Sequence, residues 1–274
     1  MKKTSLLISL VVGVLVNGDL FAQDHLTEML VDRPGIAEAT YTVPKGIYQF
    51  EVGFEYHRQA QNSTYYYPEV LMRTGILKNT ELRLQLRQIA NQEQGQTHSG
   101  LSPLRLGIKT KLKKQNKYFP EISVIADAII PFYDHPQPAR SVGPELIFLF
   151  ENDFYPNTSI NYNIGLVWDT DLNQDVFTGS FCYNYLPTEK IGLFVEYFSF
   201  VTDANWPGEQ GTDLGITYLI HRNAQIDLSG GYSRIRNEDN FFMSSGISFR
   251  FFKKQMGNPN AVNHFNKTIY TKTK

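Results

Sequence analysis

Apolar and polar side chains alternate through most of this chain, from Gly46 to about Phe251. The clearest run places Tyr48, Phe50, Val52, Phe54 and Tyr56 on one face and Gln49, Glu51, Gly53, Glu55 and His57 on the other. A period of two residues is typical of a β-strand, because successive side chains of a strand point to opposite sides of the sheet. The pattern recurs about twelve times in runs of roughly ten residues, the length of a transmembrane β-strand. The sequence therefore predicts an all-β fold, a transmembrane antiparallel β-barrel of about 12 strands.

A soluble barrel or sandwich with its apolar face inward would alternate in the same way. Two features favour the membrane. The runs are about twice as long as an average strand of a soluble sheet, and a dozen bulky apolar faces would overfill a soluble core. The mean hydropathy of -0.31 is compatible with a barrel, because every second residue of a spanning strand faces the lumen and is free to be polar.

The N-terminus has the pattern of a secretory signal peptide. Lys2 and Lys3 precede an apolar run, Leu6 to Val16, that is too short to cross a bilayer as a helix, and Ala22 offers a small residue for cleavage. The alternative is an N-terminal core helix. We expect a signal peptide over residues 1–22, a periplasmic segment over 23–45, the barrel over 46–251 and a C-terminal tail over 252–274.

Several classes of partner find no support in the composition. The single cysteine, Cys182, excludes an intramolecular disulfide and a cysteine-based metal site. A net charge of -1 gives no reason to expect nucleic acid. Neither metal-ligand spacing nor a phosphate-binding loop is present, so no cofactor is expected. The expected surroundings are outer-membrane lipid, with the barrel assembly machinery as a folding partner and a small-molecule solute in the lumen.

The connections between the runs differ in length, which bears on orientation. Those near Lys78, Lys114, Asp153, Pro187 and Arg222 look tighter than those near Gln61, Gln94, His135, Asn205 and Arg236. Outer-membrane barrels have short periplasmic turns and longer extracellular loops. The first group is therefore predicted to lie in the periplasm and the second outside the cell.

The segment before the first strand carries a motif rather than an alternation. It reads Asp32-Arg33-Pro34, then Glu38, then Thr42-Val43-Pro44-Lys45-Gly46, and continues into Gln49-Phe50-Glu51-Val52-Gly53. This motif resembles the opening of the family named for a putative MetA pathway of phenol degradation. Weaker similarities follow at Gly107-Ile108-Lys109, Leu193-Phe194-Val195-Glu196-Tyr197 and Asn223 to Gly231, so the resemblance extends to Phe251.

The resemblance implies an outer-membrane barrel of a kind labelled as a transporter, and the family name suggests aromatic or hydrophobic solutes. The chain departs from the family pattern in three places. Gly35 and Ala39 stand where relatives often have an acidic residue and a serine, and Ser102-Pro103 replaces a Gly-Asp pair. In addition, 23 residues follow Phe251, where such barrels usually end.

The polar faces of the strands are assigned to the lumen, where charges of both signs interleave. The lumen-lining candidates are Glu51, Glu69, Arg73, Arg83, Arg87, Arg105, Lys109, Glu145, Glu196, Asp213 and Asp227. One interpretation is a structural network of ion pairs that fills a narrow barrel, because buried charges need partners. The other is that the arginines on consecutive strands form a basic ladder that guides an anionic solute. We favour the structural network.

These observations lead to the hypothesis of a passive channel for small molecules in the bacterial outer membrane. Asp32, Arg33, Pro34 and Glu38 are expected to form a plug at the periplasmic mouth, with Arg33 and Glu38 paired to lumen charges; a disordered leader is the alternative. A structural barrel without transport remains open. A membrane-embedded hydrolase is less favoured, because no strand carries a serine and a histidine spaced as nucleophile and base on one outward face.

Overall fold

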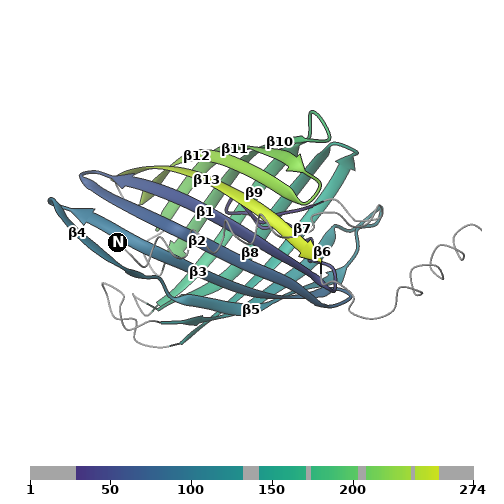
Figure 1. The fold of residues 1–274 in the computed structure, drawn as a ribbon, viewed down its shortest axis with the longest axis horizontal. Coiled ribbons are helices and arrows are strands. Elements are labelled where there is room, and N and C mark those ends of the chain that lie inside the picture. The colour runs from purple at the N-terminus through teal and green to yellow at the C-terminus, as the bar shows by residue number, and fades with distance from the viewer. Residues whose placement is uncertain (1–28, 132–141, 171–173, 203–207, 236–237, 253–274) are drawn as a thin grey trace, which may run out of the picture.

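The computed structural model describes residues 29–131, 142–170, 174–202, 208–235 and 238–252. No helix among them is long and apolar enough to span a membrane. The described residues form a wall of long strands (Figure 1). The strands are β1 (Ile47–Gln59), β2 (Asn62–Leu77), β3 (Thr80–Glu93), β4 (Gln96–Leu101), β5 (Leu104–Lys113), β6 (Glu121–Ile130), β7 (Gly143–Tyr155), β8 (Thr158–Asp169), β9 (Gln174–Tyr185), β10 (Ile191–Thr202), β11 (Glu209–His221), β12 (Ala224–Ile235) and β13 (Glu238–Phe252).

The strands close into a barrel. Every neighbouring pair is antiparallel, β1 pairs with β13, and the pairing of β2 with β3 completes the ring. Strands β4 and β5 occupy one position in the wall, because both pair with β3, β5 along Thr80–Gln85 and β4 along Gln88–Glu93. The wall therefore has 12 strand positions, as the sequence predicts. Because the barrel is closed, no sheet edge is left with unpaired backbone amides and carbonyls. Lipid could not supply hydrogen bonds to such groups.

The break between β4 and β5 falls at Ser102-Pro103. The Ser102 amide still donates to the Arg87 carbonyl at 2.8 Å. Pro103 has no amide hydrogen, so the ladder to β3 stops there and resumes at Arg105. The residues of β4 are mostly polar on both faces, which explains why the alternation of the sequence indicates only the part from Leu104 onward.

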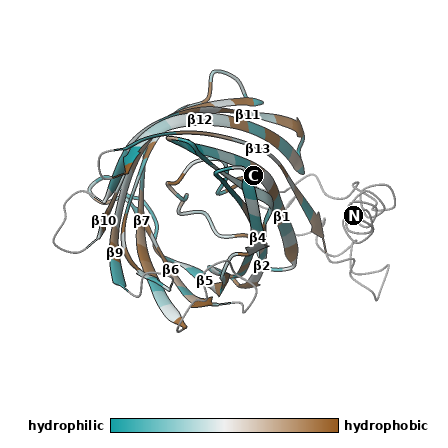
Figure 2. Cartoon of the chain, turned by 90° about the vertical axis from the view of Figure 1, so that its left-hand side faces the viewer, coloured by the Kyte–Doolittle hydropathy of each residue, from teal (hydrophilic) through white to brown (hydrophobic). Residues whose placement is uncertain are grey.

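The faces of the strands are inverted relative to a soluble protein. On β1, Tyr48 and Phe54 are 42% and 39% exposed, whereas Gln49 and Glu51 are fully buried. Figure 2 shows alternating hydrophobic and hydrophilic bands along the strands. An apolar outside and a charged inside are stable together only when lipid surrounds the wall. The barrel is therefore a membrane-spanning one.

Two connections are tighter than the sequence pattern predicts. The turns at Ala60-Gln61 and Gln94-Gly95 contain two residues each, and Gln94 and Gly95 both have positive φ angles, of 49° and 79°. Positive φ at both central residues is the geometry that joins two twisted strands directly. The prediction of longer loops near Gln61 and Gln94 is wrong. Strands β1 to β4 extend through polar residues whose types are typical of loops, so only two residues remain in each turn. Those near His135, Asn205 and Arg236 lie outside the described residues.

The connection near Lys114, predicted to be tight, is longer and spans residues 114–120 between β5 and β6. The other connections predicted to be short are short, and all of them lie at the end of the barrel where β1 begins and β13 ends. The predicted signal peptide and the tail beyond Phe252 lie outside the described residues.

Candidate functional site

Residues 29–46 cross the interior of the barrel without regular secondary structure (Figure 2). We call residues 29–46 the inner segment. It leaves the lumen at a tight turn, where Lys45 bridges to Gly75 of β2 and Gly46 takes a φ of 85°, a conformation that favours glycine. A Cβ on Gly75 would overlap the backbone of Pro44. The inner segment therefore packs directly against the wall where β1 begins.

Side chains of the wall satisfy the backbone amides of the inner segment. An irregular segment cannot pair its own amides, and a buried amide without an acceptor is costly. The acceptors are Glu51 for Asp32 and Arg33 (3.0 and 3.1 Å), Glu196 for Ile36 (2.9 Å), Asn163 for Glu38 (2.8 Å), Glu151 for Thr40 (3.2 Å) and Glu81 for Val43 (2.5 Å). Glu151 and Glu196 thus hold the inner segment, and Glu51 and Glu81 hold both the inner segment and Arg73.

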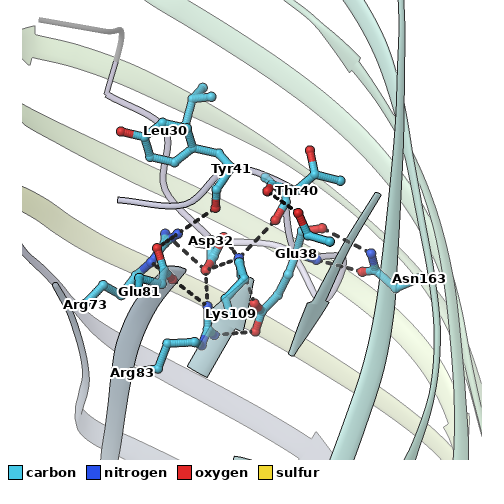
Figure 3. Close-up of polar contacts among 12 residues, drawn as sticks. Leu30, Asp32, Glu38, Thr40, Tyr41, Arg73, Glu81, Arg83, Lys109 and Asn163 are labelled. Atoms are coloured by element: carbon cyan, nitrogen blue, oxygen red, sulfur yellow. Dashed lines mark hydrogen bonds and ion pairs between the residues drawn. The ribbon is translucent and has the colours of Figure 1, made fainter. Parts of the chain in front are cut away.

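Asp32 lies at the centre of a cluster of cations (Figure 3). Its carboxylate is 2.6 Å from Arg83, 3.0 Å from Arg73 and 2.8 Å from Lys109. These three cations come from β2, β3 and β5, three adjacent wall positions. The first residue of the Asp-Arg-Pro motif is therefore the shared anion of three strands.

The cluster controls the ionisation of Asp32. Burial alone would raise the pKa of this carboxyl, but the charges of Arg73, Lys109 and Arg83 outweigh burial and hold the pKa well below its usual range. Asp32 is thus a carboxylate over the whole physiological pH range.

Arg73 binds the wall and the inner segment together. It donates to Glu81 at 2.8 Å, to Glu51 at 2.9 Å and to the carbonyl of Tyr41 at 3.1 Å. The side chain is 1% exposed. Removing one partner from such a buried group costs about 3–5 kcal/mol, because the remaining charges lose their compensation.

Glu38, six residues after Asp32, forms a second anchor of the inner segment. Its carboxylate is 2.7 Å from Arg83 and 3.2 Å from Lys109, and its backbone carbonyl accepts a hydrogen bond from Asn163. Burial raises the pKa of Glu38, and the neighbouring charge of Asp32 adds to this, although Arg83 opposes both. Glu38 therefore gives up its charge at a higher pH than Asp32.

Arg33 binds the neighbouring part of the wall, formed by β2, β12 and β13. Its guanidinium is 3.1 Å from Glu69, 3.4 Å from Asp227 and 2.6 Å from the Ser244 hydroxyl. Two wall glycines, Gly53 and Gly246, make room for it, since a Cβ on either would overlap the guanidinium. Asp32 and Arg33 therefore fasten the inner segment to two adjacent parts of the wall that share β2, and Pro34 follows them at the edge of a cavity.

All the lumen-lining candidates named from the sequence face the interior, but they separate into groups. Arg73, Arg83 and Lys109 are buried under the inner segment. Arg87 and Arg105 instead line the cavity, with side chains 31% and 33% exposed. The proposed basic ladder is thus interrupted, because Arg73 and Arg83 are bound to Asp32 and Arg83 is also bound to Glu38.

A cavity of about 530 Å³ remains in the lumen beside the inner segment. Its lining is partly aromatic, which the sequence analysis does not anticipate. Five rings, each in contact with the next, follow the inner surface of the wall from β10 through β13 and β1 to β2. They are Phe200, Phe198, Phe242, His57 and Tyr66, with centroids 5.6, 6.0, 5.4 and 5.6 Å apart, and we call them the aromatic arc. Arg87 ends the arc, 4.7 Å from the Tyr66 ring centre.

Glycines on β11 and β12 make room for two rings of the aromatic arc to lie against the wall. A Cβ on Gly211 would lie 2.6 Å from the Phe198 ring, and one on Gly231 would overlap Phe242. The signal for this arrangement is present in the sequence, because Phe198 and these glycines occupy polar-side positions of their strands. Trp168 falls on the apolar side of the alternation in β8 but lines the cavity, because β8 ends there and its side chain turns over Gly143.

The lumen charges of the two sides of the barrel differ. We call β2, β3 and β5 the cationic side, because they carry Arg73, Arg83, Arg87, Arg105 and Lys109. We call β10 to β12 the acidic side, because their lumen faces carry Glu196, Glu209, Asp213 and Asp227. Among the described residues, only Asp227 of these four makes an ion pair. Within the described part of the chain, no three His, Cys, Asp or Glu side chains are arranged to hold a metal ion.

A closed wall of 12 strand positions, apolar outside and charged inside, defines a β-barrel of the bacterial outer membrane. Residues 31–251 match the family described as "Putative MetA-pathway of phenol degradation", and the chain belongs to it, as the motif around Asp32 predicts. No curated protein matches the sequence.

Solved structures with the same fold are outer-membrane proteins. The chain is similar to the COG4313 outer membrane channel from Pseudomonas putida F1, with a TM-score of 0.54, 12% identity, and coverage of 80% of this chain and 99% of that one. It is also similar to the NanC porin, with a TM-score of 0.52, 7% identity, and coverage of 73% and 98% respectively. At these identities the likeness establishes the fold.

Proposed function

We propose that this protein is an outer-membrane channel through which small molecules diffuse passively, with its N-terminal segment as a constriction inside the lumen. The observation that carries the proposal is the path of the inner segment. It crosses the barrel interior, is fastened to β2, β3 and β5 by Asp32 and to Glu196 of β10, across the lumen, by the Ile36 amide, and leaves a cavity of about 530 Å³ beside it. A barrel built only for structure has no need of an open, polar and aromatic cavity.

The relatives support the same role. Two similar structures are those of an outer membrane channel and a porin, and the family is named for phenol degradation. We therefore propose small aromatic or hydrophobic compounds as solutes. The proposal assigns the chain no catalytic activity and no nucleic-acid partner, and it takes outer-membrane lipid and the barrel assembly machinery as its surroundings and folding partner.

The proposed domain organisation follows from this role. Residues 1–22 direct export, residues 23–45 form the constriction, residues 46–251 form the barrel and residues 252–274 form a tail. Asp32, Arg33, Pro34 and Glu38 act as the plug motif within the constriction. Its anchors are ion pairs and amide bonds to side chains, which can be exchanged one at a time without unfolding the wall.

Single-channel recording of the refolded protein tests the proposal. Deleting Gln23 to Ala39 removes both anchoring carboxylates, Asp32 and Glu38. The deletion should raise the conductance, because most of the inner segment no longer occupies the lumen. Folding is checked by heat-modifiable migration on gels. Glu93→Gln, an exposed carboxylate at the turn between β3 and β4, is the control for a change of charge alone. Normal folding with an unchanged current would exclude the constriction.

A further inference from the structure

Two carboxylates at the cavity lack a cationic partner. Asp213 lines the cavity, is 3% exposed, and its Oδ1 makes no hydrogen bond. Glu209 also lines the cavity and accepts a hydrogen bond from the Ser233 hydroxyl at 2.7 Å. Among the described residues neither carboxylate forms an ion pair. A buried carboxylate without a cation has lost its hydration without compensation, so a cation that reaches it is bound favourably.

The two carboxylates lie among the rings of the aromatic arc. Glu209 stands opposite Phe200 in the pairing of β10 with β11. Asp213 stands opposite Gly231, the glycine over which the Phe242 ring lies. Negative charge and aromatic faces therefore alternate over one patch of wall formed by β10 to β13. Aromatic faces attract organic cations through the negative potential of the ring, and a nearby carboxylate strengthens the attraction.

The opposite wall does not offer an anion the same opportunity. Arg105 is 2.8 Å from Glu145, and Arg87 is 3.8 Å from Glu69. A solute anion would have to compete with these carboxylates of the protein. A solute cation meets no competing lysine or arginine at Asp213 or Glu209 among the described residues. The charge of the solute is therefore decided by the acidic side of the cavity.

We propose that the cavity is a binding site for small organic cations, amines or quaternary ammonium compounds with an apolar body. The ammonium group lies beside Asp213 and Glu209, and the apolar body packs on Phe198 and Phe242. A volume of about 530 Å³ is within the range of small-molecule sites. The proposal deepens the proposed channel function by naming a class of solute, and it rests on that function only for its physiological role.

The first experiment compares three ligands of similar size and different charge. Benzyltrimethylammonium, benzyl alcohol and phenylacetate are titrated by calorimetry into the refolded full-length barrel in neutral detergent at low salt, where charge interactions are least screened. The expected result is that the cation binds at least about tenfold tighter than the other two. Equal affinities, or tighter binding of phenylacetate, would overturn the proposal.

The second experiment locates the site. Asp213→Asn should weaken benzyltrimethylammonium binding about tenfold and leave benzyl alcohol binding unchanged. Glu93→Gln, the same change of charge on the exposed turn between β3 and β4, should alter neither. If Asp213→Asn does not fold, Glu209→Gln repeats the test. Unchanged cation binding in a folded variant at either carboxylate, or equal weakening in the Glu93 control, would contradict the site.

The two proposals fail in different ways. A barrel that conducts ions and binds the three ligands equally overturns the cation site and leaves the channel intact. A barrel that binds the cation and shows no ionic current retains the site and overturns the channel. Binding is measured without flux, so neither result depends on the other.

Discussion

The two sides of the lumen are made from the same alternating pattern but are stabilised differently. On β2, β3 and β5, Arg73, Arg83 and Lys109 are locked by carboxylates, including Asp32 of the inner segment. On β10 and β11, Glu196 accepts the Ile36 backbone amide, and Asp213 lines the cavity with an Oδ1 that makes no hydrogen bond. The first side is a structural network. The second is the side with spare binding capacity.

Side-chain size follows the same division. The cationic side fills its part of the lumen with long arginine and lysine side chains. The acidic side combines glycines with flat rings, as where Phe198 covers Gly211 and Phe194 covers Gly215. The cavity lies between the two sides, with Arg87 and Arg105 in its lining on one side and Phe198, Glu209 and Asp213 on the other. A polar lumen is therefore not uniform in function, and removing one charge on each side should have different consequences.

The largest expected effect is at the centre of the cationic side. Arg73→Gln leaves Asp32, Glu51 and Glu81 with one cation fewer and should lower the free energy of unfolding by about 3–5 kcal/mol. Urea unfolding in lipid vesicles, followed by heat-modifiable migration, measures the change. Asp213→Asn on the acidic side is the control and should cost less than about 1 kcal/mol, since it removes a charge without a partner. Equal losses would remove the distinction between the sides.

A smaller effect is expected where the inner segment touches the wall. Gly75→Ala places a methyl group against the backbone of Pro44 and should destabilise the barrel by about 1–3 kcal/mol, as overpacking does, and raise the conductance by displacing the inner segment. Gly179→Ala on β9 is the matched control, because a Cβ at this position would lie 3.9 Å from the nearest atom, the carbonyl oxygen of Asn163. A normal current and stability in Gly75→Ala would show that the contact is not needed.

The two anchoring carboxylates should respond to pH in opposite directions. The folded pKa of Glu38 is raised, so its contribution to stability is complete below about pH 4.3 and is lost as the pH rises through the folded value. The folded pKa of Asp32 is lowered, so its contribution is complete above about pH 3.9 and is lost as the pH falls through the folded value.

Urea unfolding between pH 3 and pH 8 tests this difference. Glu38→Gln should flatten the dependence above about pH 4.3, and Asp32→Asn the dependence below about pH 3.9. The two profiles would coincide if both carboxyls had ordinary pKa values, and that result would contradict the electrostatic description of the cluster.

The smallest effect concerns the arginines of the cavity. Arg87→Gln combined with Arg105→Gln removes two charges that are about one-third exposed, so stability should change by no more than about 1 kcal/mol. At low salt the reversal potential should move toward cations, because screening is weak and the carboxylates of the other side remain. A reversal potential that stays constant while folding is normal would place both arginines outside the ion path.

The alternation of residues was sufficient to predict most strands of the wall. It was insufficient to predict strand β4 and the turn that precedes it. Tyr48 to Tyr56 indicate an outward face from their own period, because a strand fixes the direction of each side chain locally. The strand β4 and the tight turn at Gln94-Gly95 are missed, because their polar residues are extended only by pairing with β3. Propensity describes a segment alone, and pairing across a hairpin overrides it.

The sequence by itself determined the class of fold, the lumen faces and the family, because period two and the motif at Asp32 are local properties of the chain. Only the tertiary structure decided which charges meet. Asp32 and Arg83 are 51 positions apart, and Arg33 and Asp227 are 194 apart. Their pairing depends on how the closed barrel staggers its strands and on the path of the inner segment. The aromatic arc was decided in the same way, since it passes from β13 to β1, which lie at opposite ends of the barrel sequence and become neighbours only when the barrel closes.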